Sequence, residues 1–236
     1  DWRKHCNFER NYELGIWTNY PNNRQKVVKR MQKYLLTGNS GTIGQHMSSF
    51  ESSQRFDLSS EHEIESWCNK VEIKNKNLVH LAAIVGASQV DKDPEYARKV
   101  NVRGSEQLAQ IAFSKGVNKF FFASTAHVYK HSSHALSEKT LKIPQNLYAE
   151  MKLEAEEKIL EIFKFNLHKL VIFRIFSVLD FDSRPGTLGG IIKQAIYEKR
   201  QISIKNALDK RDFMTPKTIA QTIEKCVSND IDGGIY

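Results

Sequence analysis

Four short apolar runs spread along the chain constrain its fold more than any other feature. Runs of this length, rich in branched and aromatic side chains and bounded by turn residues, are typical of strands buried in a parallel sheet. The runs are Lys33–Thr37, Asn77–Ala83, Lys119–Thr125 and Lys169–Phe176. The sequence therefore predicts four buried strands.

Helical segments separate the later runs. One is expected to begin with Asp93 as N-cap and Pro94 at its first position, and to end near Gly116. Another is expected over residues 147–165, and two more follow, the first near residues 191–199. Strand and helix in alternation imply right-handed crossovers, so we predict an α/β fold with a doubly wound parallel sheet. In such sheets ligands bind beyond the carboxyl ends of the strands, and the motifs at those ends matter most.

Composition narrows the class of protein. At 236 residues, 40% of them hydrophobic and 26% charged, the chain is ordinary for a globular protein with one substantial core. No apolar run approaches the roughly 20 residues of a membrane span, and the first thirty residues are unlike a signal peptide. The three cysteines are widely spaced and form no CxxC pair, which disfavours a zinc site or a disulfide framework. We expect a cytoplasmic protein with no metal and no membrane partner.

The formal net charge of +8 raises the alternative of a nucleic-acid binder. Residues 1–33 carry eight Lys or Arg against three Asp or Glu, which accounts for +5 of that charge. The remainder has no Lys/Arg tract interleaved with aromatic residues, so a solvated basic surface is the simpler interpretation. We therefore expect no nucleic-acid partner, although a dinucleotide would profit from some of this charge.

The first buried run ends in a glycine pattern, Thr37-Gly38-Asn39-Ser40-Gly41-Thr42-Ile43-Gly44. Gly38 permits a tight turn, Gly41 lets backbone amides approach a pyrophosphate, and Gly44 allows a following helix to pack on the strand. The N-terminus of that helix would favour the anionic charge. A simple tight turn is the alternative, but the position directly after a buried strand favours a dinucleotide loop.

A tyrosine and a lysine follow the third run at helical spacing. Tyr148 and Lys152 are four residues apart, so both lie on one helix face, which Ala155, Ile159 and Ile162 continue inward. A phenol has a pKa of about 10, and a nearby ammonium together with an oxidised nicotinamide would lower that pKa. The hydroxyl of Thr125, at the end of the third run, would hold a substrate oxygen beside the phenol. Taken alone, a YxxxK pair also occurs in surface helices.

Together these motifs resemble the extended short-chain dehydrogenases/reductases. The order is TGxxGxxG, the strand end His80–Ala83, a helical Asn101, Thr125 and the YxxxK pair. Within that family the resemblance is to the NAD-dependent epimerase/dehydratase group, which includes nucleotide-sugar epimerases and dTDP-4-dehydrorhamnose reductase. It extends over residues 92–112 and covers the chain from about Met31 onward. The resemblance implies a Rossmann-like dinucleotide domain, an NAD or NADP cofactor and a nucleotide-sugar substrate.

The resemblance also assigns roles. Thr125, Tyr148 and Lys152 would form the catalytic triad, and Asn101 would buttress the central helix and bridge toward the lysine. Tyr148 and Lys152 would also contact the cofactor. The other residues implied to bind it are Gly38, Asn39, Ser40, Gly41, Thr42, Ile43, Gly44, Asp57, Leu81, Ala82 and Ala83.

Several positions depart from the family pattern. The substrate-phosphate element "R-x-x-N" stands here as Arg174 to Ser177, and the late "RDF" element is Arg211-Asp212-Phe213, so Ser177 and Arg211 are the implied substrate residues. Dehydratases carry an Asp-Glu pair after the catalytic threonine, where this chain has Ala126 and His127, which disfavours a dehydratase.

Only twelve residues separate Gly44 from Asp57, too few for the usual helix and two strands. Either this region is trimmed or residues are absent from the chain, which leaves the choice between NAD and NADP open.

We predict a division into an extension (1–30), a dinucleotide domain (31–180) and a reduced C-terminal substrate lobe (181–236). The five large aromatic residues of the extension need cover from another lobe or subunit, so a homodimer is left open. An epimerase is the favoured reaction, because the region from Asn101 to Tyr129, which ends in the stretch STAHVY, resembles that branch. A keto-sugar reductase is the first alternative and a non-catalytic dinucleotide-binding protein the second.

Overall fold

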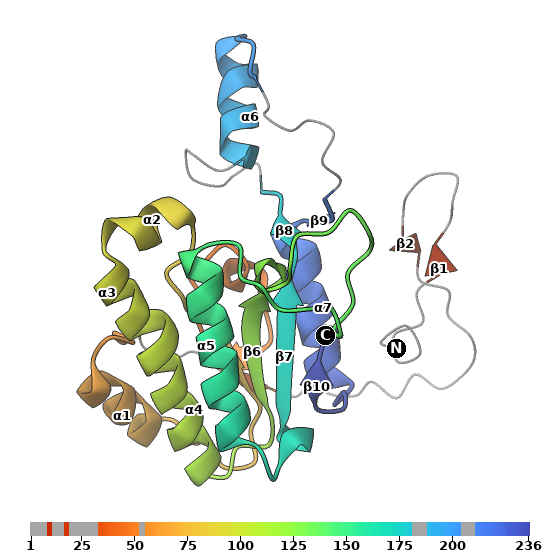
Figure 1. Ribbon diagram of the computed structural model, residues 1–236. Helices are drawn as coiled ribbons and strands as arrows, with labels where there is room; N and C mark the ends of the chain where they lie inside the picture. The colour runs from red at the N-terminus through yellow and green to blue at the C-terminus, as the bar shows by residue number, and fades with distance from the viewer. Residues whose placement is uncertain (1–8, 11–16, 19–32, 52–54, 181–187, 204–210) are drawn as a thin grey trace.

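The computed structural model describes residues 9–10, 17–18, 33–51, 55–180, 188–203 and 211–236. Its centre is a six-stranded sheet, all of whose pairs are parallel, in the order β10-β7-β6-β5-β3-β4 (Figure 1). The strands are β3 (Tyr34–Thr37), β4 (Phe50–Glu51), β5 (Leu78–His80), β6 (Phe120–Thr125), β7 (Leu170–Ile175) and β10 (Gly234–Ile235). Each of the four predicted strands is confirmed.

Helices cover both faces of this sheet. On one face α1 (Glu61–Lys70), α4 (Ser105–Ser114) and α5 (Leu147–Ile162) share a core with alternate strand residues such as Leu35 and Phe122. On the other face α7 (Pro216–Ser228) packs on the intervening residues, among them Leu36 and Phe121. The period of two follows from the pleat, which points successive side chains to opposite faces. The predicted doubly wound, Rossmann-like α/β fold is confirmed.

The helix predicted to begin at Asp93 and to end near Gly116 forms as one helical stretch with three segments: α3 (Pro94–Arg98), the π-helical η3 (Lys99–Gly104) and α4. The Asp93 side chain accepts a hydrogen bond from the Tyr96 amide at 3.0 Å, and Gly116 has a φ of +75°. A short helix, α2 (Ala87–Lys92), precedes this stretch.

The connection from β3 to β4 is abbreviated. It contains one 3₁₀ turn, η2 (Gly44–His46), where the glycine pattern predicted an α-helix. The carboxylate of Glu224, on α7, accepts hydrogen bonds from the Ser48 amide (2.7 Å), the Ser49 amide (3.1 Å) and the Tyr34 hydroxyl (2.9 Å). Helix α7 therefore holds the β3–β4 connection, which has a 3₁₀ turn where an α-helix was expected.

Smaller elements complete the description. Figure 1 shows α6 (Leu188–Glu198) standing beyond the carboxyl ends of the strands, where β8 (Ser177–Val178) pairs with β9 (Phe213–Met214). The remaining elements are the pair β1 (Glu9–Arg10) and β2 (Trp17–Thr18), and the 3₁₀ turns η4 (Ala126–Val128) and η5 (Leu167–Lys169). Among the described residues, no helix is both long and apolar enough to cross a membrane.

The division at residues 30 and 180 stays a prediction, and most of the extension lies outside the described residues. The C-terminal part nevertheless contributes to the main sheet. Gly234 and Ile235 pair with Val171 and Ile172 of β7, and α7 belongs to one of the two cores. Residues 216–236 are therefore part of the sheet and its cover.

Candidate active site

Two of the three predicted glycines are required by close packing, Gly38 against the segment after β5 and Gly44 within the loop itself. Gly38 has a φ of +81°, and a side chain there would place a Cβ 2.6 Å from the Ala82 amide nitrogen. A Cβ on Gly44 would overlap the carbonyl oxygen of Gly38. Gly44 therefore lets the loop close on itself, and the predicted role of packing a helix on the strand is wrong.

Gly41 differs from the other two glycines. Only the Gly38 carbonyl oxygen, at 3.2 Å, lies near the position that a Gly41 Cβ would take. Ser40, Gly41 and Thr42 are all exposed, and we call these three residues the crest of the loop. Asn39 and Ile43 are half-buried beneath it. The Gly41 amide donates to the Gly38 carbonyl at 3.0 Å. Since a three-residue 3₁₀ turn follows, the expected support from an α-helix N-terminus is not provided here.

The segment after β5 lies against this loop. The Leu81 amide donates to the Thr37 carbonyl at 3.1 Å, so predicted cofactor residues of the two strand ends come together as expected from a parallel sheet. Leu81, Ala82 and Ala83 are each half-buried.

Asn101 fixes the end of this segment. Its side-chain oxygen accepts from the Ile84 amide at 2.8 Å, and its side-chain nitrogen donates to the Ile84 carbonyl at 2.9 Å. Asn101 therefore holds the backbone of the strand-end segment at Ile84. The bridge from Asn101 toward Lys152, expected through backbone or water, stays a prediction.

His80 is a residue to which the sequence analysis gave no role. Its ring nitrogens hydrogen-bond to the Thr37 hydroxyl at 2.6 Å and the Ser105 hydroxyl at 2.9 Å. Burial, and secondarily the charge of Lys152, lowers the pKa of His80 to about 3, so the imidazole is neutral. It ties the ends of β3 and β5 to the start of α4. Its place in the strand-end motif His80–Ala83 was the sequence feature that could have indicated this role.

Helix α5, which carries Tyr148 and Lys152, packs against β6 and against η4, the turn that follows β6. Thr125 is the last residue of that strand, and its hydroxyl oxygen accepts from the His127 amide at 3.2 Å. Lys152 is 2% exposed, and its ammonium lies 3.8 Å above the ring centroid of Phe122. The grouping of Thr125, Tyr148 and Lys152 in one catalytic site stays a prediction.

The electrostatics of this group differ from the expectation. Burial raises the pKa of Tyr148 to about 12. Burial also lowers the pKa of Lys152 to about 7, against a smaller opposing effect of the Glu156 carboxylate. The predicted lowering of the phenol pKa by Lys152 is not found in the protein alone. Near neutral pH the phenol keeps its proton, and the lysine is close to half charged.

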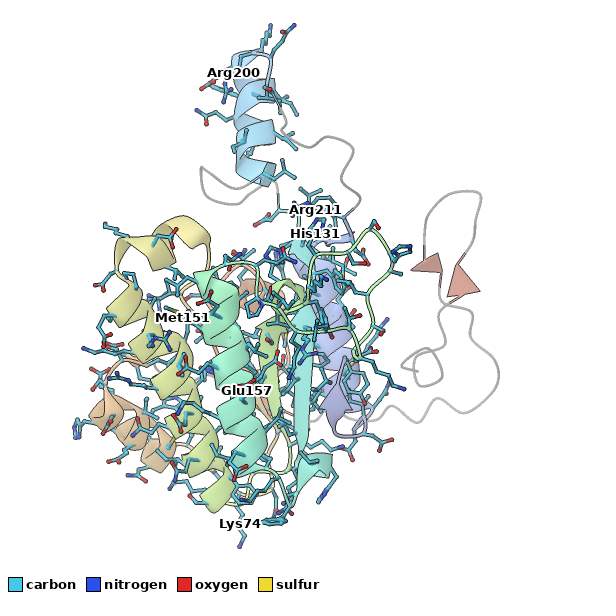
Figure 2. The ribbon with its side chains drawn as sticks, viewed as in Figure 1. Lys74, His131, Met151, Glu157, Arg200 and Arg211 are labelled. Atoms are coloured by element: carbon cyan, nitrogen blue, oxygen red, sulfur yellow. The ribbon has the colours of Figure 1, made fainter. Side chains whose placement is uncertain are left out.

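The implied substrate residues lie together beyond β7. Ser177 is in β8, and its amide donates to the carbonyl of Asp212, the neighbour of Arg211, at 3.2 Å. The Arg211 side chain is exposed (Figure 2). Burial, and then the charge of Arg211, lowers the pKa of His127.

Arg174 is turned inward and is 5% exposed. Its guanidinium contacts Glu156 and the Tyr129 hydroxyl. A substrate phosphate therefore cannot use this arginine in the described conformation, although the "R-x-x-N" resemblance implied a substrate element at this position.

Asp57 stands in an exposed turn before α1. Its amide donates to the Glu63 carboxylate at 2.7 Å, and its own carboxylate accepts from the Ser59 amide at 2.8 Å. It is therefore an exposed turn residue. Its predicted contact with the cofactor stays a prediction.

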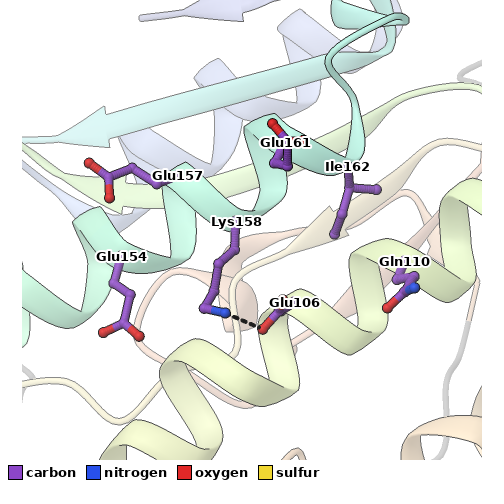
Figure 3. A pocket seen from close by; sticks show the side chains of 7 residues that line it. All are labelled: Glu106, Gln110, Glu154, Glu157, Lys158, Glu161 and Ile162. Atoms are coloured by element: carbon purple, nitrogen blue, oxygen red, sulfur yellow. Dashed lines mark ion pairs between the residues drawn. The ribbon is translucent and has the colours of Figure 1, made fainter.

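A shallow pocket elsewhere in the molecule plays no part in this site. It lies between the outer faces of α4 and α5, and Lys158 and Glu106 form an ion pair of 2.9 Å within it (Figure 3). Its lining residues are Glu106, Gln110, Glu154, Glu157, Lys158, Glu161 and Ile162. In the described part of the chain, no group of three or more His, Cys, Asp or Glu side chains is arranged to hold a metal ion.

Fold and strand-end geometry define a Rossmann-like α/β protein with its candidate site at the carboxyl edge of the sheet. The model of the family described as "NAD dependent epimerase/dehydratase family" matches residues 49–236. The chain belongs to that family. The match begins after the glycine loop, so the assignment of residues 37–44 depends on the motif and on its place in the fold.

Individual relatives are more distant. The chain is 30% identical over 112 residues to a UDP-glucose 4-epimerase of Rhizobium leguminosarum bv. trifolii, a match that covers 46% of this chain and 34% of the relative. It is 33% identical over 91 residues to methionine adenosyltransferase 2 subunit beta of Xenopus laevis, covering 38% and 27%. The matched segments thus span about a third of these relatives.

Among solved structures, RMD from Pseudomonas aeruginosa complexed with NADPH is similar with a TM-score of 0.75 at 20% identity. This similarity covers 87% of this chain and 76% of that one.

Proposed function

We propose that this protein binds NAD or NADP and transfers hydride at a carbon of a nucleotide-activated sugar, as an epimerase that passes through a keto intermediate. The observation that carries the proposal is that α5, which carries Tyr148 and Lys152, packs on β6, which ends at Thr125 and lies two strands from β3 and its glycine loop. The family to which the chain belongs and the epimerase relative support it.

The residues present fit a dinucleotide. The crest Ser40–Thr42 is exposed, and Gly41 has no side chain that would block approach to it. The side chain of Lys152 is 2% exposed, and its ammonium lies over the Phe122 ring. Burial of a cation is costly, and the hydroxyl groups of a ligand would stabilise its charged form. The glycine loop, the segment Leu81–Ala83 and Lys152 are the residues that would hold the cofactor.

When bound, a nicotinamide cofactor accepts and donates hydride. Tyr148 would take the proton of a sugar hydroxyl as that hydroxyl becomes a ketone, and return it in the reverse direction. The Thr125 hydroxyl, which already accepts from the His127 amide, has its own proton left to donate to the same sugar oxygen. The positive charge of Lys152 would stabilise the phenolate while it exists.

A reductase acting on a nucleotide keto-sugar is the alternative reaction. The Tyr148 pKa of about 12 favours it, because a phenol that keeps its proton is ready to donate one to a ketone oxygen. A dehydratase is disfavoured, because Ala126 and His127 provide no acid–base carboxyl groups next to Thr125.

The decisive experiment is to denature the purified protein, identify any released nicotinamide cofactor, and then incubate the native protein with UDP- and dTDP-sugars. An epimerase would interconvert two sugars without net change in cofactor. A reductase would consume NADH or NADPH with a keto-sugar. No bound cofactor and no affinity for an added one would overturn the proposal.

A non-catalytic dinucleotide-binding protein is a second candidate, favoured by the abbreviated β3–β4 connection. Similarity to a protein named as a subunit of methionine adenosyltransferase supports the same candidate. Bound cofactor without turnover of any nucleotide sugar would favour it over the enzyme.

A further inference from the structure

A fully buried carboxylate lies one helical turn beyond Lys152. Glu156 is 0% exposed and accepts from Arg174 of β7 through Nη2 at 2.5 Å and through Nε at 3.1 and 3.2 Å. The Ser124 hydroxyl also donates to it. The remaining guanidinium nitrogen of Arg174 donates to the Tyr129 hydroxyl at 2.9 Å. Every polar group of this cluster therefore has a partner.

The cluster joins the elements that carry the candidate catalytic residues. Glu156 is on α5 with Tyr148 and Lys152, while Ser124 immediately precedes Thr125 at the end of β6. Ser124 is also the register partner of Arg174 in the neighbouring strand. A single carboxylate thus connects the helix of the lysine to the strand of the threonine.

We propose that Glu156 and Arg174 are positioning residues, which hold the Lys152 ammonium and the Thr125 hydroxyl in fixed relation at the site. Stability alone does not explain such a cluster, because apolar side chains of similar volume are often as stabilising as a buried ion pair. The charge of Glu156 has a second effect, since it is the anion that favours the charged form of Lys152 in an otherwise apolar setting. This inference rests on the proposed function.

Charged and titratable groups lie on the helix of Lys152 and on the described elements that pack against this helix. The phenol of Tyr148 and the carboxylate of Glu156 come from its own helix, and the neutral His80 comes from β5. Arg174 lies beyond Glu156. On the elements that pack against α5, Arg98 pairs with Glu154, Arg103 with Glu95 and Glu106 with Lys158. Asp91 and Lys92 of α2 and Lys99 of η3 are exposed, and His127 of η4 is half-buried. Glu156 is therefore the anion whose removal should change Lys152.

The test compares Glu156→Gln, the double variant Glu156→Gln/Arg174→Met, and the control Glu157→Gln, an equal charge change at an exposed position of the same helix. The double variant is included because Glu156→Gln alone leaves Arg174 buried with a weakened partner, which destabilises the fold. Thermal unfolding selects the variants that retain the native state. Nuclear magnetic resonance of ¹³C-labelled lysine, with Lys152→Met for assignment, then follows the Lys152 titration without any cofactor or substrate.

We expect the folded double variant to titrate Lys152 at a lower pH than wild type, by about one unit, because the neighbouring anion is gone. We expect kcat/KM to fall about 100-fold, the scale of a misplaced reacting group, and its alkaline limb to move in the same direction as the Lys152 titration. Glu157→Gln should behave as wild type in both measurements. Glu156→Asp should recover part of the titration.

A folded double variant with the wild-type Lys152 titration would overturn the inference, whatever the enzyme's substrate proves to be. So would an unchanged kcat/KM and pH profile. Failure of the proposed function is distinguishable, because wild type would then bind no nicotinamide cofactor while the Lys152 titration could still be compared among variants.

Discussion

The two halves of the carboxyl edge are built in different ways. Around β6 and α5, buried side chains hold one another: Glu156, Arg174, Ser124 and Tyr129 form a cluster with matched partners. Around β3 and β4, the glycine loop is shaped by its own backbone and ends in one 3₁₀ turn. Sequence patterns predicted both halves, but only the first has the full set of elements that they implied.

This difference locates the weak point of the proposed function. The half that would carry out proton transfer has its groups fixed before any ligand arrives. The half that would hold a pyrophosphate has lost the α-helix N-terminus, a contribution of about 0.3–1 kcal/mol at an exposed site. Cofactor affinity is therefore the property in which this chain should depart most from a longer-looped relative.

The largest effect is expected from Tyr148→Phe, which tests the β6–α5 half of the site. Phenylalanine keeps the ring in its half-buried setting but removes the proton, so turnover should fall by roughly two to four orders of magnitude. Cofactor affinity, measured by calorimetry, should stay nearly unchanged because the glycine loop is untouched. Tyr96→Phe is the matched control, since it removes a hydroxyl from a 42% exposed tyrosine on α3. Wild-type turnover in Tyr148→Phe would remove the β6–α5 half from the mechanism.

A substitution in the glycine loop tests the other half. Gly41→Val should weaken cofactor binding by about 100-fold or more, because the side chain would cover the exposed crest. The fold should survive, since the Cβ meets only the Gly38 carbonyl at 3.2 Å, a distance that a small backbone shift relieves. Calorimetry with NAD and NADP, alongside circular dichroism, checks both statements. Unchanged affinity would mean that the loop is a turn and nothing more.

A smaller effect, on the pH dependence of stability, is expected from His80. This residue lies between the two halves, since it is bonded to Thr37 of β3 and stacked on Phe122 of β6. Its pKa is about 3 in the folded protein and about 6.5 when unfolded, so the unfolded chain binds the proton first as the pH falls. The free energy of unfolding should therefore decrease between pH 6.5 and 3, with a contribution from this group of up to about 1.4 kcal/mol per pH unit.

His80→Gln should be less stable than wild type at pH 7, because it changes buried hydrogen bonds, but should lack this part of the pH dependence. Urea denaturation at pH 7 and pH 5 provides the measurement. Parallel losses in the two proteins would show that His80 is not the titrating group.

Removal of residues 1–30 should have the smallest effect. The first sheet strand begins at Tyr34, and none of the predicted cofactor residues lies in the extension. A chain that starts at Met31 should bind cofactor within about a factor of two of the full chain. A truncated chain that folds but binds no cofactor would place part of the dinucleotide site in the extension.

Sequence patterns predicted the strands because a buried parallel strand leaves a short apolar run, as Phe120–Thr125 does. They did not predict β10, since two residues, Gly234 and Ile235, are too few to leave such a signal. The count between Gly44 and Asp57 showed that elements were short there, but not that the helix was the one reduced to a turn. That outcome depends on α7, more than 150 residues away in the sequence.

The members of the candidate site stay a prediction, whereas part of its expected chemistry differs from the structure. Spacing alone grouped Tyr148 with Lys152, yet their pKa values follow from burial, which spacing does not report. The cluster around Glu156 was missed, although one signal was available. Arg174 is a charged residue inside the apolar run Lys169–Phe176, and a buried arginine requires a buried acid.

The hold of Glu224 on the β3–β4 connection has a consequence for the order of folding during synthesis. Ser48 and Glu224 are 176 residues apart in the chain. At a synthesis rate of about 5–20 residues per second, roughly 10–35 seconds pass between the two, and the exit of α7 from the ribosome comes later still. Throughout that interval the amides of Ser48 and Ser49 lack their acceptor. The β3–β4 connection is therefore synthesised early, but it gains these hydrogen bonds only after α7 has been synthesised.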